Sequence, residues 1–117
     1  MKTITEVREK LFNVLERNGL PIFLQGSMSE DAEYPDTFLT YFIPTNDEDI
    51  FADNTATHTA YTVQAAVYSN DIDHKDALAE KIKADMKAEG FLFQTGGDVA
   101  SDIETHTGYM QQFIILT

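Results

Sequence analysis

Cysteine and tryptophan are absent from the 117 residues, and basic residues are scarce. Without cysteine, the chain has no disulfide and no thiolate metal site. Lys and Arg together number 8 against 20 Asp and Glu, which gives a formal net charge of −12. Binding to nucleic acid depends largely on basic side chains that replace counterions on phosphates. We therefore do not expect this acidic chain to bind nucleic acid directly.

Long apolar runs are also lacking. The longest uninterrupted ones have four residues, such as Phe113–Leu116, whereas a membrane-spanning helix needs about 20. The first twelve residues alternate charged and apolar side chains and lack the apolar stretch of a signal peptide. We expect a soluble protein that is assembled inside the cell.

The content of apolar residues is 43%, which is ordinary for a globular protein and too high for a disordered acidic tail. A chain of this length forms one domain and buries about two-thirds of its unfolded surface. We expect residues 1–117 to form that single domain.

All the basic residues fall in two segments, 1–18 and 73–89, and both have the pattern of an amphipathic helix. In the first segment, Thr3 and Glu6 have the spacing of a capping box, and Gly19 is a natural helix stop. Its apolar stripe consists of Ile4, Val7, Leu11, Val14 and Leu15.

In the second segment, Asp73 is the expected N-cap and Gly90 the expected stop. Leu78, Ile82 and Met86 form its apolar stripe. A row of small residues should let the helix lie close to a sheet. This row consists of Ala77, Ala84 and Ala88.

The remaining apolar segments have the composition and alternation of β-strands. Pro44 should end the second strand, and Gly96-Gly97 should form a turn after the fourth. The order α-β-β-β-α-β-β predicts an α+β fold, a mostly antiparallel sheet of about five strands with two helices packed on it. The predicted strands are Ile22–Gln25, Phe38–Ile43, Thr57–Ser69, Phe91–Thr95 and Tyr109–Leu116.

Three long loops should connect these elements: Gly26–Thr37, Thr45–Ala56 and Gly96–Thr107. Loops of about 12 residues are commonly functional. Most of the acidic residues outside the helices fall in them. These acids are Glu30, Asp31, Glu33, Asp36, Asp47, Glu48, Asp49, Asp53, Asp98, Asp102 and Glu104.

No motif for catalysis, metal or cofactor binding accompanies these acids. Read as an EF-hand, the stretch from Asp47 has Phe51 and Ala52 where a ligand and a glycine are required. The histidines, His58, His74 and His106, have no zinc-site spacing. We expect no enzymatic activity, no resident metal and no cofactor, although a weak divalent-ion site between chains remains open.

Two predicted strands are apolar on both faces, Phe38–Phe42 and Phe113–Leu116. Two helices leave one face of a five-stranded sheet partly open. Burial of both faces therefore predicts self-association.

The chain also resembles a family of small tail-completion proteins from long-tailed bacteriophages and related prophages. The likeness covers most of the chain and lies in an ordered set of short segments. These segments are Gln25-Gly26, Tyr34 to Phe42, Phe51-Ala52-Asp53-Asn54, Val67-Tyr68-Ser69, Gly90-Phe91, Asp98 to Asp102 and Thr105 to Gly108.

This resemblance implies a tail terminator, also called a tail-to-head joining protein. The members of this family look like compact α+β domains, which assemble into a ring that is commonly a hexamer. The ring caps the tail tube, stops its polymerisation and meets the head connector, and DNA later passes through it. The resemblance thus implies copies of the chain itself, the tube protein and the connector as partners, a place at the neck of the virion, and no catalysis.

Loop residues within the matching segments are the candidate subunit or partner interface. They are Tyr34, Pro35, Asp36, Thr37, Phe51, Asp53, Asn54, Thr105, His106 and Thr107. A second set of acids could line the lumen, where like charge would keep DNA from sticking, or face a basic partner. These are Glu30, Asp31, Glu33, Asp47, Glu48 and Asp49.

Two alternatives remain open. The chain could be another small neck or head–tail connector protein, since such proteins share this size and context. It could also be an acidic DNA mimic that inhibits a DNA-binding protein, which its size and net charge of −12 suit. The concentration of acids in loops rather than along regular elements disfavours the mimic.

Overall fold

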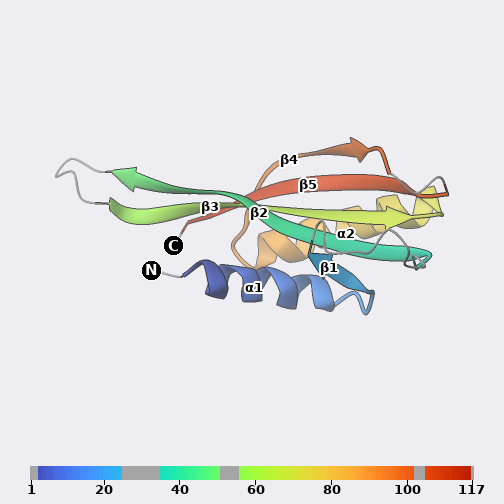
Figure 1. The fold of residues 1–117 in the computed structure, drawn as a ribbon, viewed down its shortest axis with the longest axis horizontal. Helices are drawn as coiled ribbons and strands as arrows, with labels where there is room; N and C mark the ends of the chain where they lie inside the picture. Colours follow the sequence, from blue (N-terminus) through green and yellow to red (C-terminus); the bar gives the residue numbers. More distant parts are fainter. Residues whose placement is uncertain (1–2, 25–34, 51–55, 102–104, 117) are drawn as a thin grey trace.

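A computed structural model describes residues 3–24, 35–50, 56–101 and 105–116, with the backbone alone over 45–50 and 56–59. Two helices and five strands follow one another in the predicted order, which confirms the α+β fold (Figure 1). The elements are α1 (Ile4–Glu16), β1 (Ile22–Leu24), β2 (Thr37–Ile50), β3 (Ala56–Ser69), α2 (Ile72–Ala88), β4 (Leu92–Val99) and β5 (Thr107–Leu116).

The strands form one sheet in the order β1-β2-β3-β5-β4. The pairs β2–β3, β3–β5 and β4–β5 are antiparallel, and only β1–β2 is parallel. The prediction of a mostly antiparallel sheet is therefore confirmed. The edges of the sheet are β1, which is short, and β4.

Both helices pack on the same face of this sheet. The core joins residues of α1 and α2 to odd-numbered positions of the central strands, such as Leu39, Val63 and Phe113. Because side chains alternate along a strand, the even-numbered positions of these strands lie on the opposite, outer face. The residues on that face include Phe42, Gln64, Tyr68 and Ile114, which are all uncharged.

Helix α1 begins and ends as predicted. The Thr3 hydroxyl accepts a hydrogen bond from Glu6 N, and Thr3 N donates to the Glu6 carboxylate, completing the capping box. Gly19 follows the helix with φ of +65°, which favours glycine. The predicted stripe is buried except for Ile4, which is 42% exposed. Its buried members are Val7, Leu11, Val14 and Leu15.

Helix α2 differs from the prediction at its start and along its small-residue row. Asp71, not Asp73, is the N-cap, because its carboxylate accepts from the backbone N–H groups of Asp73 and His74. Ala77, Ala84 and Ala88 are exposed, so that row does not face the sheet.

The close approach of α2 to the sheet occurs instead at Ala79, which is 4% exposed. Its carbonyl accepts a 2.6 Å hydrogen bond from the Gln111 side chain on β5. Ile82 and Met86 are buried as predicted, and Leu78 packs at the margin of the core.

The predicted loop Thr45–Ala56 is wrong over residues 45–50 and at Ala56, because β2 continues past Pro44 to Ile50 and pairs there with β3. The rest of this loop, residues 51–55, lies outside the described residues. Proline cannot donate to a ladder and is tolerated at irregularities. Here the β2–β3 register shifts between Phe42 and Thr45, around Pro44. Beyond this shift the two strands continue as a two-stranded ribbon, in which Thr45–Ile50 pairs with Ala56–Thr62. The ribbon is seen at the left of Figure 1.

The predicted turn at Gly96-Gly97 is also wrong, and with it the start of the loop Gly96–Thr107. Both glycines lie within β4, opposite Gln111 and Met110 of β5. A Cβ at Gly96 would lie 3.2 Å from the Met110 carbonyl oxygen. Gly96 thus allows close approach between the strands. Neither glycine reverses the chain, because both are paired with β5. Of the predicted loop Gly26–Thr37, only Pro35–Thr37 is described, and Thr37 begins β2.

Candidate interaction surfaces

Two of the three predicted interface segments meet at one end of the sheet. In the register of the central strands, Thr37 lies opposite Ser69, and Ser69 lies opposite Thr107. The Nε2 atom of His106 donates to the Pro35 carbonyl oxygen at 2.8 Å, joining residues 71 apart in the sequence. The segments Pro35–Thr37 and Thr105–Thr107 therefore form one surface, which we call the loop end.

Short polar contacts hold the loop end together. The hydroxyl oxygens of Thr37 and Ser69 lie 2.9 Å apart, and Ser69 Oγ also accepts from Asp71 N, the N-cap residue of α2. Asn70 donates to Asp36 twice, from its backbone N–H and from its side-chain amide. These bonds tie the start of β2 to the junction between β3 and α2.

The loop end has a buried layer beneath an exposed one. His106 and Thr37 are 9% and 8% exposed, whereas Asp36, Thr105 and Thr107 are exposed. The His106 ring also contacts Phe38, which stacks on Tyr68 with ring centroids 5.3 Å apart. The buried members position the exposed ones, and only the exposed ones can contact a partner without rearrangement.

The other predicted site residues are either outside the described part of the chain or described by their backbone alone. Tyr34, Phe51, Asp53, Asn54, Glu30, Asp31 and Glu33 lie outside the described residues. Asp47, Glu48 and Asp49 are placed by their backbone in the ribbon, opposite Ala60, Thr59 and His58. The ribbon lies at the end of the sheet opposite the loop end (Figure 1).

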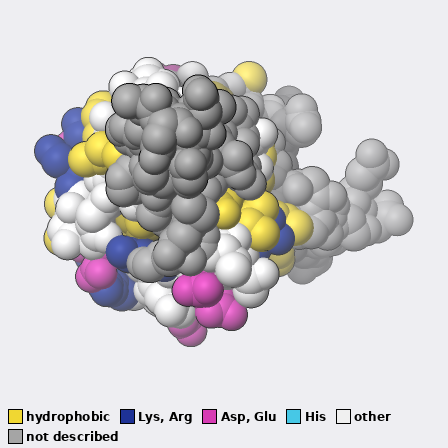
Figure 2. Space-filling model, turned by 90° about the vertical axis from the view of Figure 1, so that its left-hand side faces the viewer, with side chains coloured by type: hydrophobic (Ala, Val, Ile, Leu, Met, Phe, Trp, Pro, Cys, Tyr) yellow, Lys and Arg dark blue, Asp and Glu magenta, His cyan; other side chains and the backbone are white. Residues whose placement is uncertain are grey.

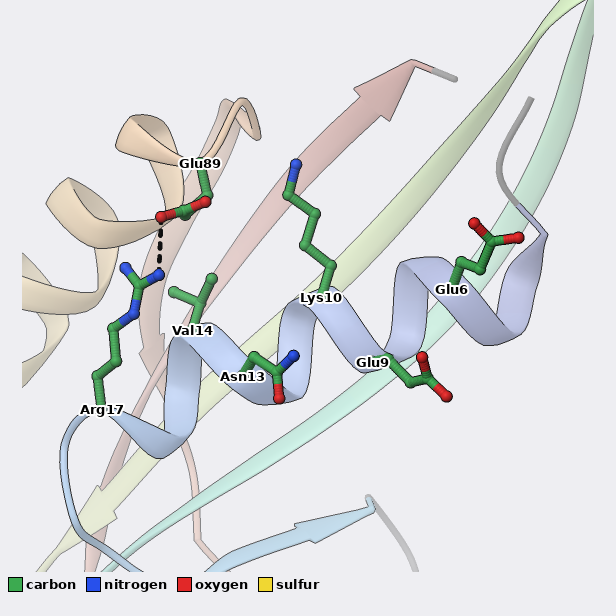
Figure 3. Close-up of a pocket in the computed structure, with 7 residues that line it drawn as sticks. All are labelled: Glu6, Glu9, Lys10, Asn13, Val14, Arg17 and Glu89. Carbon is green, nitrogen blue, oxygen red and sulfur yellow. Dashed lines mark hydrogen bonds and ion pairs between the residues drawn. The ribbon is translucent and has the colours of Figure 1, made fainter.

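A groove of about 380 Å³ lies between α1 and the end of α2 (Figure 3). An ion pair in this groove joins Arg17, the C-cap of α1, to Glu89, the C-cap of α2, at 2.7 Å. The other lining residues are Glu6, Glu9, Lys10, Asn13 and Val14. The hydrogen bond from Arg17, together with its positive charge, lowers the pKa of the Glu89 carboxyl below its ordinary value. This ion pair, which we call the latch, therefore joins the C-terminal ends of the two helices.

Lys75 is a buried cation that the sequence pattern did not predict. Its side chain is 2% exposed, and its Nζ lies 2.9 Å from Asp98 and 3.6 Å from Asp76. Asp98 and Asp76, with Glu80 and Tyr109, line a surface pocket of about 360 Å³. The signal that could have found Lys75 is its spacing, because it precedes Leu78 by three residues and Ile82 by seven and so continues the apolar stripe of α2.

Within the described part of the chain, no group of three or more His, Asp or Glu residues is arranged to hold a metal ion. Among the same residues, no helix has the length and apolar content needed to cross a membrane. No protein-family model matches the sequence, and no curated protein matches it significantly.

Proposed function

We propose that this chain is a structural protein of a long-tailed bacteriophage or prophage, a tail terminator that forms a ring on the tail tube. The ring, commonly a hexamer in such proteins, would end tube polymerisation and meet the head connector, and DNA would pass through it. The proposal derives from the ordered resemblance along the sequence, and it implies a non-catalytic protein located at the neck of the virion.

The observation that carries the proposal is the meeting of Pro35–Thr37 with Thr105–Thr107 at the loop end. These segments resemble the phage family, and the 2.8 Å hydrogen bond from His106 to Pro35 joins them in space. Binding residues are disproportionately found on loops that a rigid scaffold positions, as the paired strands position these two segments. The exposed members Asp36, Thr105 and Thr107 are its candidate contacts.

The shape of the molecule suits head-to-tail assembly. It measures 53 × 28 × 23 Å, with the loop end at one end of its long sheet and the ribbon at the other. A closed ring requires two different patches on each copy, so that one copy's first patch meets its neighbour's second. Two unlike ends satisfy that requirement.

The acids of the ribbon extend the proposal to the channel. Asp47, Glu48 and Asp49 follow one another along β2 in the ribbon. If the ribbon faces the lumen, its acids would repel passing DNA and prevent retention. If it faces outward, they would meet a basic surface of the tube or the connector.

The decisive experiment measures tail length by electron microscopy in phage or prophage lysates with and without the protein. Overlong tails in its absence, restored to normal length when it is supplied, would support a terminator. Tails of normal length that fail to join heads would indicate another neck protein. Normal, joined tails would defeat the proposal.

One observation favours an acidic DNA mimic as a second candidate. Asp76 and Glu80, one turn apart on α2, share a surface pocket with Asp98 of β4. The buried Lys75 ammonium beside Asp98 offsets part of this charge. Capture of a basic DNA-binding protein by the wild-type chain, lost in Asp76→Asn/Glu80→Gln but retained in Glu6→Gln/Glu9→Gln, would support the mimic.

A further inference from the structure

Strand β4 is an edge of the sheet, and its first six residues, Leu92–Gly97, include no charged residue and no proline. Leu92, Phe93, Gln94 and Thr95 are all exposed, with Leu92 at 58%. Proteins commonly protect exposed edges with lysine, proline or bulges, because an open edge pairs readily with another strand. Within Leu92–Gly97 itself, the one such device is a register shift against β5 between Phe93 and Thr95.

The two apolar side chains at this edge lie on opposite faces. Phe93 lies on the helical face, where its ring meets Phe113 at 5.7 Å and the Lys83 ammonium at 4.0 Å. Leu92 lies opposite Ile114 on the outer face. A strand added beside β4 would cover both of them, combining main-chain hydrogen bonds with apolar burial.

The ribbon has a second open edge. Strand β5 accompanies β3 only as far as the pair Ala60–Leu116. Over Ala56–Thr59, β3 therefore has only β2 beside it among the described strands. Its sequence there, Ala-Thr-His-Thr, contains no Asp, Glu, Lys or Arg. By contrast, β2 has Asp47-Glu48-Asp49 in the ribbon.

We propose that β4 of one copy pairs with the Ala56–Thr59 edge of β3 in a second copy. Two chains that each carry a charge of −12 repel, so they meet most easily where neither edge is charged. The β2 edge of the ribbon, with three consecutive acids, is disfavoured for the same reason. This inference rests on the proposed function only in requiring that the chain meets copies of itself.

This pairing joins two different patches. Each copy that donates its ribbon to a neighbour still offers its own β4 to another copy. Successive additions therefore either close a ring or extend a filament, depending on the rotation between copies. The sheets of neighbouring copies would become continuous through main-chain hydrogen bonds.

Disulfide trapping tests the pairing directly, because the chain has no cysteine of its own. The test variants are Thr57→Cys/Thr95→Cys and His58→Cys/Thr95→Cys. Two variants are used because positions 57 and 58 of β3 lie on opposite faces, and only one of them would share the face of position 95. Mild oxidation of at least one of them should give a ladder of dimers and larger multiples on a non-reducing gel. The single variants should stay monomeric, and a mixture of the singles should give dimers.

Two results of this experiment would overturn the inference. If Thr95→Cys alone forms dimers as readily as the double variants, β4 pairs with β4 instead. If neither double variant forms a ladder at the highest attainable concentration, the two edges do not meet.

A charge placed on the edge provides an independent measurement. Leu92→Lys should weaken self-association by about tenfold or more in light scattering over a range of concentrations. Ile72→Lys is its matched control, because Ile72 is 57% exposed on α2 and the change in net charge is the same. Equal effects of the two variants, or no effect of Leu92→Lys, would contradict the pairing.

The outcomes separate this inference from the proposed function. A ring whose mass Leu92→Lys leaves unchanged would overturn the edge pairing and leave the tail-terminator proposal intact. Normal tails in the absence of the protein would overturn the terminator proposal, even if the double-cysteine variants form a ladder.

Discussion

Tyr68 covers Gly108 so closely that a Cβ at position 108 would lie 2.6 Å from its Cε1 atom. The two residues are direct neighbours across β3 and β5, and Val99 of β4 closes the other side at 2.8 Å. The Tyr68 ring cannot simply move aside, because it stacks on Phe38. This row of the outer face therefore requires glycine for space.

Gly108→Ala should lower the free energy of unfolding by about 1–3 kcal/mol, the usual cost of inserting a methyl group into a filled site. Urea denaturation measures the change. The matched control is Gly97→Ala on β4, where a Cβ would meet nothing within 4 Å. Similar losses in both variants would show that β-strand glycine itself, rather than the Tyr68 contact, decides the cost.

His106→Ala should destabilise the chain by about 1–3 kcal/mol, because it leaves the Pro35 carbonyl without its 2.8 Å donor and empties a buried site. His74→Ala is the control, since His74 is exposed and its contact with Thr37 is 3.4 Å long. Chemical denaturation compares the two. A smaller loss for His106→Ala than for His74→Ala would mean that the His106 bond does not hold the loop end.

Asp98→Ala should cost about 1 kcal/mol, because it removes the closest counter-charge of the buried Lys75 ammonium while Asp98 itself is largely solvated. Lys75→Met should be close to neutral or stabilising, since an apolar side chain of similar length fits the buried site. In the Lys75→Met background, Asp98→Ala should then cost almost nothing. Additive effects in this double-mutant cycle would show that the pair is not coupled.

The Arg17–Glu89 latch should make stability depend on pH. Arg17 lowers the pKa of Glu89 in the folded chain below its ordinary value. The contribution of Glu89 is therefore complete above the unfolded value and is lost as the pH falls through the lower folded value. The melting temperatures of wild type and Glu89→Gln should differ at pH 7 and converge in acid.

Glu9→Gln is the control for this latch. It removes the same charge from the same groove, and Glu9 makes no ion pair with the described residues. A pH-independent difference for Glu89→Gln, or an equal convergence for Glu9→Gln, would exclude the latch as the cause.

Local signals in the sequence predicted much of the fold. The Thr3–Glu6 capping box, the stripe through Leu11 and the stops at Gly19 and Gly90 are short-range features, and the structure confirms each of them. The order of elements followed from these signals. Even the wrong N-cap of α2 was displaced only from Asp73 to Asp71.

The predictions failed at positions where the neighbouring strand determines whether a residue lies in a turn or in a strand. Pro44 and Gly96 are both turn residues by composition, yet each lies inside a strand. A shift of register accommodates the proline, and a close carbonyl of β5 favours the glycine. Neither condition is visible before the neighbouring strand is placed.

The sequence predicted which segments belong to the candidate interface, but not which of their residues contact one another. Pro35 and His106 were both named from the sequence, but nothing local indicates that one donates to the other's backbone. The pairings of Lys75 with Asp98 and of Arg17 with Glu89 likewise join distant elements. Such contacts result from the way the helices and strands pack, which no spacing rule along the chain encodes.

The latch at the helix ends has an electrostatic consequence for the whole molecule. Two helix C-termini, each with a partial negative charge, lie side by side there. Cations reach across from the opposite helix: Lys81 of α2 donates to Asn18 beyond α1, and Lys10 of α1 lies over the Phe91 ring beyond α2. Lys81 also forms an ion pair with Asp85 at 2.8 Å. An approaching anion would therefore have to compete with Asn18 and Asp85 for this ammonium group.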